Sequence, residues 1–442
     1  MSAAEERLNL PTQFWDSRIV LARIREAAHA RMVSPDAVLG CVLATVAACV
    51  SPHLGVDTGV DDATSLNLLV ANVGPPGSSK SQAEKAVRRL MPTPGHVRTG
   101  SIGSGEGIAE IFMGERPTGE VTKQGREITE RAQVWNNALL VADEGEVMSR
   151  LGERSGSVLG TTLRSAFTGG AIGQSNATRE RTRHVPSGSY SFGLIAAFQP
   201  KTIRPLLDEE PQGTPQRFLY FRSVDPGIPA PAEQEPLWGD GGTEPREPSC
   251  EDDLSRAVEK AATQGAFIGQ GITFPAAVTA EVRRERWYAH QGVTPAALDA
   301  HRTLLRLKVA ALLLILDGRG AGAVTTEDWE LASQIVDVSS NVRDDLVRQA
   351  AADRAAEGEA RKIDHIDREV RTEQAKHEQK VERLAVRVRK YAAAAGTAGV
   401  PLSGRGGLPR KFDQRERGLL DEALDLATYK RWVTVTEGVV VT

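Results

Sequence analysis

One segment of the sequence has the residue types and spacing of a loop that binds phosphate groups. The segment comprises Gly74, Pro75, Pro76, Gly77, Ser78, Ser79, Lys80 and Ser81. It follows the apolar run 66–73 and precedes a helix-compatible stretch, which is the strand–loop–helix context that a phosphate loop requires. Backbone N–H groups would bind the phosphates, Lys80 would reach the β- and γ-oxygens, and the Ser81 hydroxyl would hold Mg²⁺. We therefore expect ATP and Mg²⁺ as cofactors, although Ser79 stands where the usual second glycine would be.

Two carboxylates follow a second apolar run, residues 138–142. Asp143 could bind the nucleotide's Mg²⁺ through water, and Glu144 could polarise the water that attacks the γ-phosphate. Glu106, which lies between two glycines, is a second candidate for the base because some ATPases carry this carboxylate just after the helix that follows the phosphate loop. The sequence leaves the choice between Glu144 and Glu106 open.

Two more polar residues lie at the ends of predicted strands. Gln199 follows the apolar run 191–198 and could orient the lytic water, or could instead cap a turn before proline. Arg217 precedes the run 218–221 and could stabilise transition-state charge in the nucleotide site of a neighbouring subunit. A surface salt bridge is the alternative for Arg217.

The elements that must position these residues form an α/β pattern. Between residues 66 and 225, apolar strand-like runs alternate with helical and polar stretches, which is typical of a sheet with helical crossovers. Residues 38–50 read as a buried helix, too short for the roughly 20 residues that cross a bilayer. Residues 350–390 carry charges of both signs and read as a long solvated helix, with coiled-coil pairing possible.

Composition excludes several classes of protein. The 442 residues are 40% hydrophobic and 25% charged, which is globular composition, and the net charge of −4 excludes a histone-like polycation. Three cysteines without a CxxC spacing disfavour a disulfide framework or a cysteine-rich zinc site. Because the N-terminus also lacks a secretory pattern, we expect a soluble cytoplasmic protein with no membrane contact. The eight histidines show no HxxxH or HxxE spacing, so we expect no catalytic metal beyond Mg²⁺.

In this order, the motifs resemble the ATPase core of the minichromosome-maintenance (MCM) replicative helicases, which are AAA+ ATPases. They are also similar to phage and mobile-element primase–helicase ATPases. The resemblance is carried by Lys80-Ser81-Gln82, Asp143-Glu144, the segment 196–200 and Arg217-Phe218. Two positions depart from the family pattern: Gln199 stands where the family has asparagine, and Leu219 where it has aspartate.

The resemblance covers about residues 50–340. His301-Arg302-Thr303-Leu304 and the segment 324–328 are similar to the family's helical lid, which implies that Arg302 is the second-sensor arginine that contacts ATP. Arg306 is the alternative if the register differs. The family's large N-terminal DNA-binding half is missing, and only about 50 helical residues stand in its place.

The fold class expected is therefore α/β, with an AAA+ P-loop ATPase core, a helical lid and a C-terminal winged-helix domain. The boundaries expected are an N-terminal helical segment 1–55, the core 56–225, a proline-rich linker 226–250, the lid 251–345, a charged long helix 346–390 and the winged helix 391–442. Helix, turn, helix and β-hairpin is the element order of a winged helix.

Two basic regions are candidates for DNA contact. Arg179, Arg181 and Arg183 alternate in the interval that holds a channel-facing β-hairpin in the MCM resemblance, although an exposed loop that pairs with acids is the alternative. The second region precedes and begins the presumed recognition helix (413–429) and contains Arg405, Arg410, Lys411, Arg415 and Arg417. A winged helix can also bind protein.

The resemblance implies a DNA helicase or translocase that forms a ring, expected to be hexameric, and replicates a phage, plasmid or integrated element with a primase or other replication protein. An ATP-dependent DNA-binding switch or helicase loader that does not unwind DNA is the main alternative. A regulatory ATPase whose winged helix binds a protein is the third.

Overall fold

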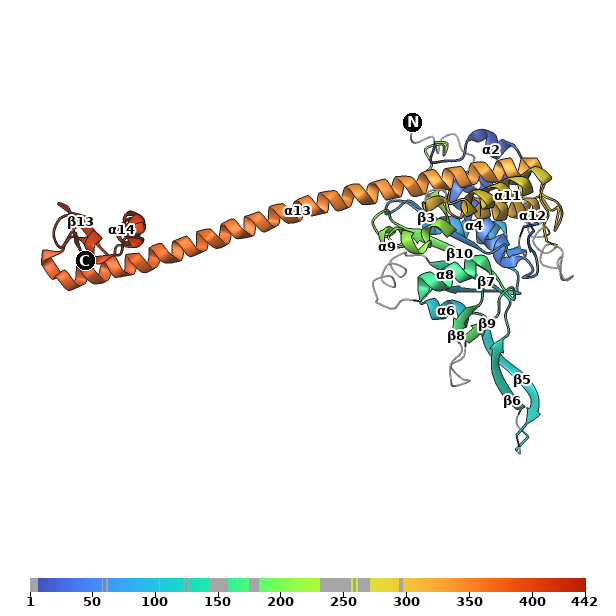
Figure 1. The fold of residues 1–442 in the computed structure, drawn as a ribbon, viewed down its shortest axis with the longest axis horizontal. Coiled ribbons are helices and arrows are strands. Elements are labelled where there is room, and N and C mark those ends of the chain that lie inside the picture. Colours follow the sequence, from blue (N-terminus) through green and yellow to red (C-terminus); the bar gives the residue numbers. More distant parts are fainter. Residues whose placement is uncertain are drawn as a thin grey trace, which may run out of the picture. The chain divides into compact units, whose positions relative to one another are not determined.

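The computed structural model describes residues 7–57, 59–60, 63–102, 104–122, 124–125, 127–142, 158–174, 183–230, 256, 260, 271–293 and 297–442. The chain divides into two compact units, Met1–Ala351 and Ala352–Thr442 (Figure 1). Among the helices described, none is both long enough and apolar enough to cross a bilayer.

The first unit is built on a five-stranded parallel sheet. Its strands are β3 (Leu68–Val73), β4 (Val97–Ser101), β7 (Asn137–Ala142), β10 (Ser191–Phe198) and β11 (Phe218–Arg222), in the order β11-β3-β10-β7-β4. The α/β class and the four apolar runs predicted as strands are confirmed. Parallel strands need crossover connections and are buried on both faces, which explains why β3 and β10 are continuous apolar runs.

The N-terminal residues cover one face of this sheet. They form α2 (Thr12–Asp16), α3 (Ile19–His29) and α4 (Pro35–Cys49). Every residue of α4 is buried, as predicted for the run 38–50. The Asn72 side chain near the end of β3 donates to the Ala37 carbonyl, whereas Asn137 at the start of β7 donates to the Ala48 carbonyl. Helix α4 therefore runs antiparallel to the strands and begins at their carboxyl edge.

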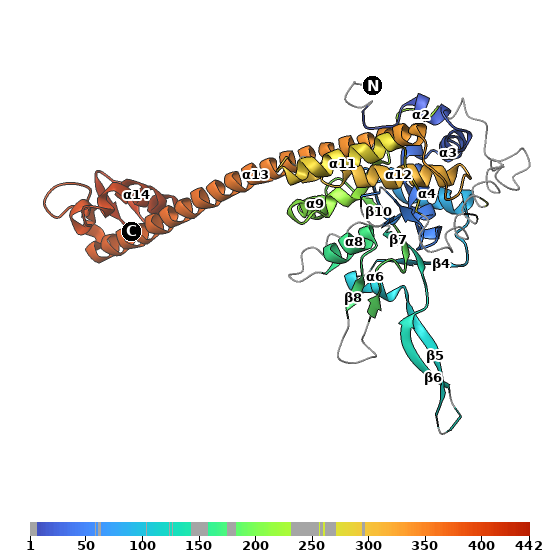
Figure 2. The ribbon, with the colours of Figure 1, turned by 45° about the vertical axis from the view of Figure 1, so that its right-hand side comes forward.

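Two hairpins lie between the strands in sequence. The first joins β5 (Met113–Val121) to β6 (Glu127–Gln133) and projects away from the sheet, with nearly every described side chain exposed or half-buried (Figure 2). The second pairs β8 (Ile172–Gln174) with β9 (Arg183–Val185), next to the helices α6 (Gly105–Glu110) and α8 (Leu159–Thr168). The sequence analysis expected only the second hairpin.

Three longer helices complete the first unit. They are α11 (Ala276–His290), α12 (Arg302–Leu316) and the beginning of α13 (Thr326–Ala395). Short elements fill the connections: α5 (Lys80–Leu90) after β3, the pair β1 (Gly55–Val56) and β2 (Thr64–Ser65), and α9 (Arg204–Leu207) after β10. Apart from Arg256 and Lys260, residues 231–270 lie outside the described part of the chain, so most of the predicted linker and the start of the lid do as well.

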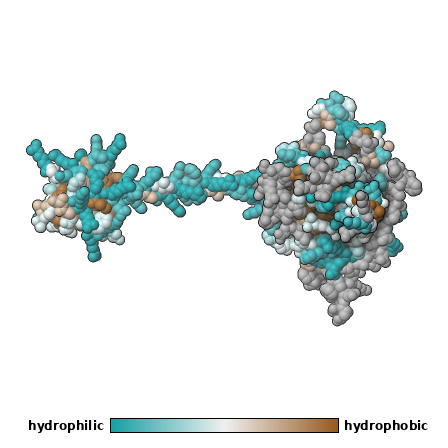
Figure 3. Space-filling view, turned by 90° about the horizontal axis from the view of Figure 1, so that it is seen from below, coloured by the Kyte–Doolittle hydropathy of each residue, from teal (hydrophilic) through white to brown (hydrophobic). Residues whose placement is uncertain are grey.

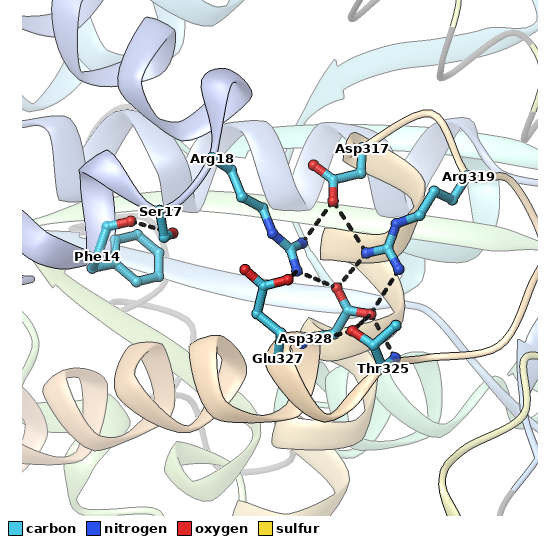
Figure 4. Close-up of polar contacts among 8 residues, drawn as sticks. All are labelled: Phe14, Ser17, Arg18, Asp317, Arg319, Thr325, Glu327 and Asp328. Atoms are coloured by element: carbon cyan, nitrogen blue, oxygen red, sulfur yellow. Dashed lines mark hydrogen bonds and ion pairs between the residues drawn. The ribbon is translucent and has the colours of Figure 1, made fainter.

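Ion pairs join the N-terminal segment to helices α12 and α13. The Arg18 guanidinium lies 2.9 Å from Asp317 at the end of α12 and 2.8 Å from Asp328 in the first turn of α13 (Figure 4). Arg319 binds the same two carboxylates, and Asp328 also accepts hydrogen bonds from the backbone and hydroxyl of Thr325. The Asp328 side chain is fully buried, so this network fixes α3 against the α12–α13 connection.

Helix α13 continues without a break from the first unit into the second. The boundary expected at 345/346 is therefore not the end of an element, and the helix ends at Ala395 rather than at residue 390. Every residue from 361 to 380 is exposed, and this stretch is mostly hydrophilic (Figure 3). The apolar positions expected to pair as a coiled coil differ in burial: Ile363 and Ile366 are more than half exposed, whereas Leu384 and Val388 are buried in the core of the second unit.

The second unit packs the end of α13 against one shorter helix and a small sheet. The sheet has the order β12-β14-β13, with β12 (Val400–Pro401), β13 (Thr434–Thr436) and β14 (Val439–Val441). The predicted C-terminal hairpin is thus present as β13–β14. The helix expected over 413–429 is shorter, because residues 416–419 form a 3₁₀ turn and α14 begins at Leu420 and ends at Tyr429.

Candidate nucleotide site at the carboxyl edge of the sheet

The phosphate-loop segment lies at the carboxyl end of β3, between that strand and α5. Open α/β sheets bind ligands at this edge, where loops leave the strands. Pro75, Pro76 and Gly77 are exposed, and Ser78 to Ser81 are half-buried. The predicted strand, loop and helix therefore follow one another as a phosphate loop requires.

The loop presents several hydrogen-bond donors that the protein does not use. The backbone N–H groups of Gly77, Ser79, Lys80 and Ser81 have no acceptor among the residues that the structure describes. The first turn of α5 carries no acidic residue, so the partial positive charge at its N-terminus is not offset. The Ser78 hydroxyl is buried without a partner. These donors fit the oxygens of a phosphate chain.

Ser79, at the position of the usual second glycine, has a left-handed backbone conformation. Its φ of 54° and ψ of 27° lie in the left-handed region, which a residue with a Cβ enters at a cost of roughly 1 kcal/mol. Gly77 also has a positive φ, 79°, and a Cβ there would meet no atom within 4 Å. Ser79 thus takes the left-handed conformation that glycine adopts more readily.

Lys80 folds back over the loop. Its ammonium group donates to the carbonyls of Gly74 at 3.1 Å and Pro75 at 2.7 Å, and partial burial lowers its pKa. These carbonyls hold the charge where phosphate oxygens would lie. A bound phosphate chain would therefore replace the carbonyls as the partner of Lys80.

The strand order brings the tip of β10 next to the loop. Strand β10 lies between β3 and β7, and the Gly74 N–H donates to the Phe198 carbonyl at 3.1 Å. Gln199 follows directly, is exposed, and its side-chain amide has no partner among the described residues. The turn that contains Pro200 is closed by hydrogen bonds between the Gln199 backbone and Thr202. The Gln199 side-chain amide takes no part in these bonds.

Ala142 pairs with Ala196, so the last residue of β7 lies opposite β10 near the same edge. Asp143 and Glu144 follow Ala142 in sequence but lie outside the described residues. The structure therefore leaves their predicted roles, the Mg²⁺ contact of Asp143 and the base function of Glu144, as predictions.

Glu106 does not lie beside the phosphate loop. It occupies the first turn of α6, after β4 rather than on a strand, and β4 is separated from β3 by two strands, about 14 Å at the usual strand spacing. Its carboxylate pairs with Arg183 at 3.3 Å. This geometry disfavours Glu106 as the base for a nucleotide bound at the loop.

A cavity of about 670 Å³ lies on the β11 side of the same edge. Ser223, just after β11, donates its N–H to the Val73 carbonyl and packs against Gly74, and Asp225 lines the cavity two residues later. The opposite wall comes from the N-terminal helices and includes Trp15 and His29. Sequence reasoning did not find this cavity, because its walls come from segments about 190 residues apart.

Asp36 is the most buried polar group of this cavity. Burial, helped by the nearby charge of Asp225, raises the pKa of the Asp36 carboxyl to about 7. A hydrogen bond from the Leu10 N–H lowers this pKa but does not outweigh burial. The Asp225 carboxylate lies 3.3 Å from Nε2 of His29, and the Asn9 side-chain oxygen is buried without a partner. The cavity thus offers acceptors to a ligand that carries amino or hydroxyl groups.

The three predicted arginines lie away from this loop. Arg217 directly precedes β11 at the amino edge of the sheet, where its guanidinium donates to the Gly213 carbonyl and its Nε is buried without a described partner. Arg302 pairs with Asp337 of α13, and Arg306 pairs with Glu281 of α11 and lies 3.6 Å from the centre of the Trp329 ring. None of these side chains reaches the phosphate loop of its own chain.

Lys308 also lies near the amino edge of the sheet, and its buried position was not predicted from the sequence. It is fully buried on α12, and its ammonium donates to the carbonyls of Asn67, just before β3, and Phe167, near the end of α8. Burial lowers its pKa well below the usual value, and the nearby Arg217 charge lowers it further. Only the single lysine in an apolar helical run could have indicated such a contact.

The predicted DNA-contacting residues fall into three groups. Arg179 and Arg181 lie outside the described residues. Arg183, on β9, is half-buried, and its guanidinium pairs with Glu106 and, at 2.6 Å, with Glu110. For Arg183, the structure therefore matches the alternative prediction, in which the arginine pairs with acidic residues. Four residues of the second unit are exposed and form no ion pair with any described residue: Arg405, Arg410, Lys411 and Arg415.

No protein-family profile matches this chain, and no curated protein matches it in sequence. In the parts of the chain that the structure covers, no cluster of three His, Cys, Asp or Glu side chains could hold a metal ion.

Proposed function

We propose that this chain is an ATP-dependent DNA helicase or translocase of MCM-like AAA+ type that acts in the replication of a phage, plasmid or integrated element. The observation that carries the ATPase part is the loop after β3, where four unpartnered N–H groups and Lys80 converge at the carboxyl edge of a parallel sheet. Ser81 is the second residue of α5, and with Asp143 it would hold Mg²⁺. Gln199 lies one strand away, where its amide would orient the attacking water.

The cavity beside Ser223 would receive the nucleoside end of ATP. Its volume of about 670 Å³ is within the range of ligand pockets, and it opens on the side of the loop away from β7. The carboxyls of Asp36 and Asp225 would accept hydrogen bonds from the exocyclic amino group of adenine and from the ribose hydroxyls.

The arginine positions support an interfacial site. Arg217 directly precedes β11 at the edge opposite the phosphate loop, and β3, which spans the sheet between the two edges, is six residues long, about 20 Å. An arginine at that edge would act on the nucleotide of a neighbouring subunit, as would Arg302 or Arg306 on the lid helices. This arrangement requires a homo-oligomer, and the resemblance favours a hexameric ring with an AAA+ core, lid and C-terminal winged helix.

DNA would contact the β8–β9 hairpin and the basic residues 405–415 of the second unit. A regulatory ATPase whose C-terminal domain binds a protein is the second candidate function, and one observation favours it. The exposed face of α14 carries Asp421, Glu422 and Asp425 and no Lys or Arg, so a duplex placed against it would meet like charge. Stimulation of hydrolysis by DNA would separate the helicase, or a DNA-binding switch, from this protein-binding ATPase.

Calorimetric titration with ATP and Mg²⁺ tests the loop. We expect Lys80→Ala to weaken binding by at least about tenfold, because it removes the ammonium group that would bind the phosphate oxygens. Lys85→Ala is the matched control, since Lys85 lies on the exposed face of the same helix. Equal affinity for wild type and Lys80→Ala would contradict the assignment.

A further inference from the structure

The second unit contains a groove that the proposed ATPase function does not use. It lies between the C-terminal part of α13 and α14 and has a volume of about 620 Å³. Its lining comes from residues 377–382 of α13 and from residues 422–430 of and just after α14. All of these residues belong to the second unit, so the groove is complete within it.

The groove combines an apolar floor with an acidic rim. Val381 and Leu426 contribute aliphatic surface. Tyr429 also lines the groove, and its side chain is largely available to a partner because the residue is 85% exposed. Single exposed apolar residues are common, but an aromatic ring beside a concave aliphatic surface is typical of protein-binding sites. The floor therefore offers apolar anchoring positions.

The charge of the rim determines the chemistry of the occupant. Four carboxylates share the rim with one histidine and one lysine, and both are already engaged: His377 lies 2.6 Å from Glu422, and Lys430 pairs with Glu382. Among the described residues, Glu378 and Asp425 form no ion pair. Nucleic acid and anionic lipid would be repelled by this rim, whereas lysine or arginine side chains would be attracted.

We propose that this groove binds a basic amphipathic helix of a partner protein. Two helices form its walls, and an amphipathic helix laid between them would place its apolar side chains on the floor and its cations against Glu378 and Asp425. The chain's own basic segment 405–417 does not fit the groove, because its large apolar residues, Leu408 and Phe412, are buried in the core of its own unit. The proposal is independent of ATP hydrolysis.

Fluorescence anisotropy with the full-length protein tests the proposal. The probe is a labelled synthetic peptide of about 14 lysines and leucines with leucine at helical spacing, and the control probe is a scrambled peptide of the same composition. We expect the amphipathic peptide to bind at least about tenfold more tightly than the scrambled one, with an affinity that falls as salt rises.

The variant Glu378→Lys/Asp425→Lys should lose this binding by at least about tenfold. The matched control is Asp367→Lys/Asp421→Lys, which makes the same charge change on α13 and α14 at exposed residues that do not line the groove. Tyr429→Ala should weaken binding without affecting folding, because the residue is 85% exposed. Equal losses in the two double variants, no discrimination between the peptides, or no binding by wild type would overturn the proposal.

Discussion

At the scale of single residues, Ser79 shows how the phosphate loop tolerates its departure from the usual pattern. A serine in the left-handed region costs roughly 1 kcal/mol, which the packing of β3 and α5 on either side offsets. A β-branched residue would cost more because its side chain is more restricted. The sequence identified the position of the loop, but it could not reveal the backbone angle that makes Ser79 compatible with it.

Asp36 gives the clearest pH dependence in the molecule. Because the pKa of its carboxyl is raised from 3.8 to about 7, the folded state holds a proton between those values that the unfolded state has released. Wild-type stability should therefore fall as pH rises from 4 to 7, by about 4 kcal/mol at most. We expect Asp36→Asn to remove most of this slope and to keep the acceptor for the Leu10 N–H.

The measurement is the midpoint of thermal unfolding at pH 5 and pH 8 for wild type and Asp36→Asn. Asp421→Asn is the control, because Asp421 is exposed on α14 and should leave the slope unchanged. If Asp36→Asn retains the wild-type slope, the pH dependence has another source.

At the scale of elements, the sequence predicted what apolar runs specify and missed what depends on tertiary contacts. Strands such as β3 and β10 are buried on both faces, so their sequences are continuous apolar runs. The β5–β6 hairpin is polar on both faces and carries neither periodicity nor an apolar run. The pairing of Arg183 with Glu106 and Glu110 joins residues more than 70 positions apart, and spacing along the chain does not reveal such contacts.

The connection between α12 and α13 should depend on one carboxylate. Desolvation alone would raise the pKa of Asp328, but hydrogen bonds from Arg319, Thr325 and Arg18 outweigh it and hold the pKa below its usual value. We expect Asp328→Ala to lower the free energy of unfolding by about 3 kcal/mol or more, because it removes the fully buried one of the two carboxylates that Arg18 and Arg319 share.

Denaturant unfolding at pH 7 measures this loss. Glu327→Ala is the matched control: Glu327 also pairs with Arg18, but its side chain is 60% exposed, so the cost should be about 1 kcal/mol or less. Because the pKa of Asp328 is depressed, the difference between wild type and Asp328→Ala should shrink as pH falls below about 4. Similar losses in the two variants at pH 7 would show that the buried network is not the main contact.

At the scale of the whole molecule, the central question is whether one chain contains a complete site. The phosphate loop and Gln199 lie at the carboxyl edge of the sheet, and Arg217 lies at the amino edge. A complete site therefore requires two subunits if Arg217 acts on ATP. The sequence identified the phosphate loop, Gln199 and Arg217 as candidates, but only the strand order shows which of them lie at the same edge of the sheet.

Mixing two inactive variants tests the interfacial site. Lys80→Ala should lack ATP binding, and Arg217→Ala should bind ATP without turning it over. In a ring, an Arg217→Ala subunit beside a Lys80→Ala subunit has an intact loop and an intact arginine, so an equal mixture should recover up to about one quarter of wild-type turnover. A mixture that assembles and remains inactive would contradict the composite site.

Steady-state ATP hydrolysis, measured with and without single-stranded and forked DNA, tests whether this chain is a DNA-coupled ATPase. The comparison is between wild type and Glu144→Gln, which removes the predicted base while keeping the size of the side chain. We expect wild-type hydrolysis to rise when DNA is added and the variant to lose turnover in both conditions. Hydrolysis that is indifferent to DNA, or unchanged in Glu144→Gln, would contradict the account of a DNA-coupled motor.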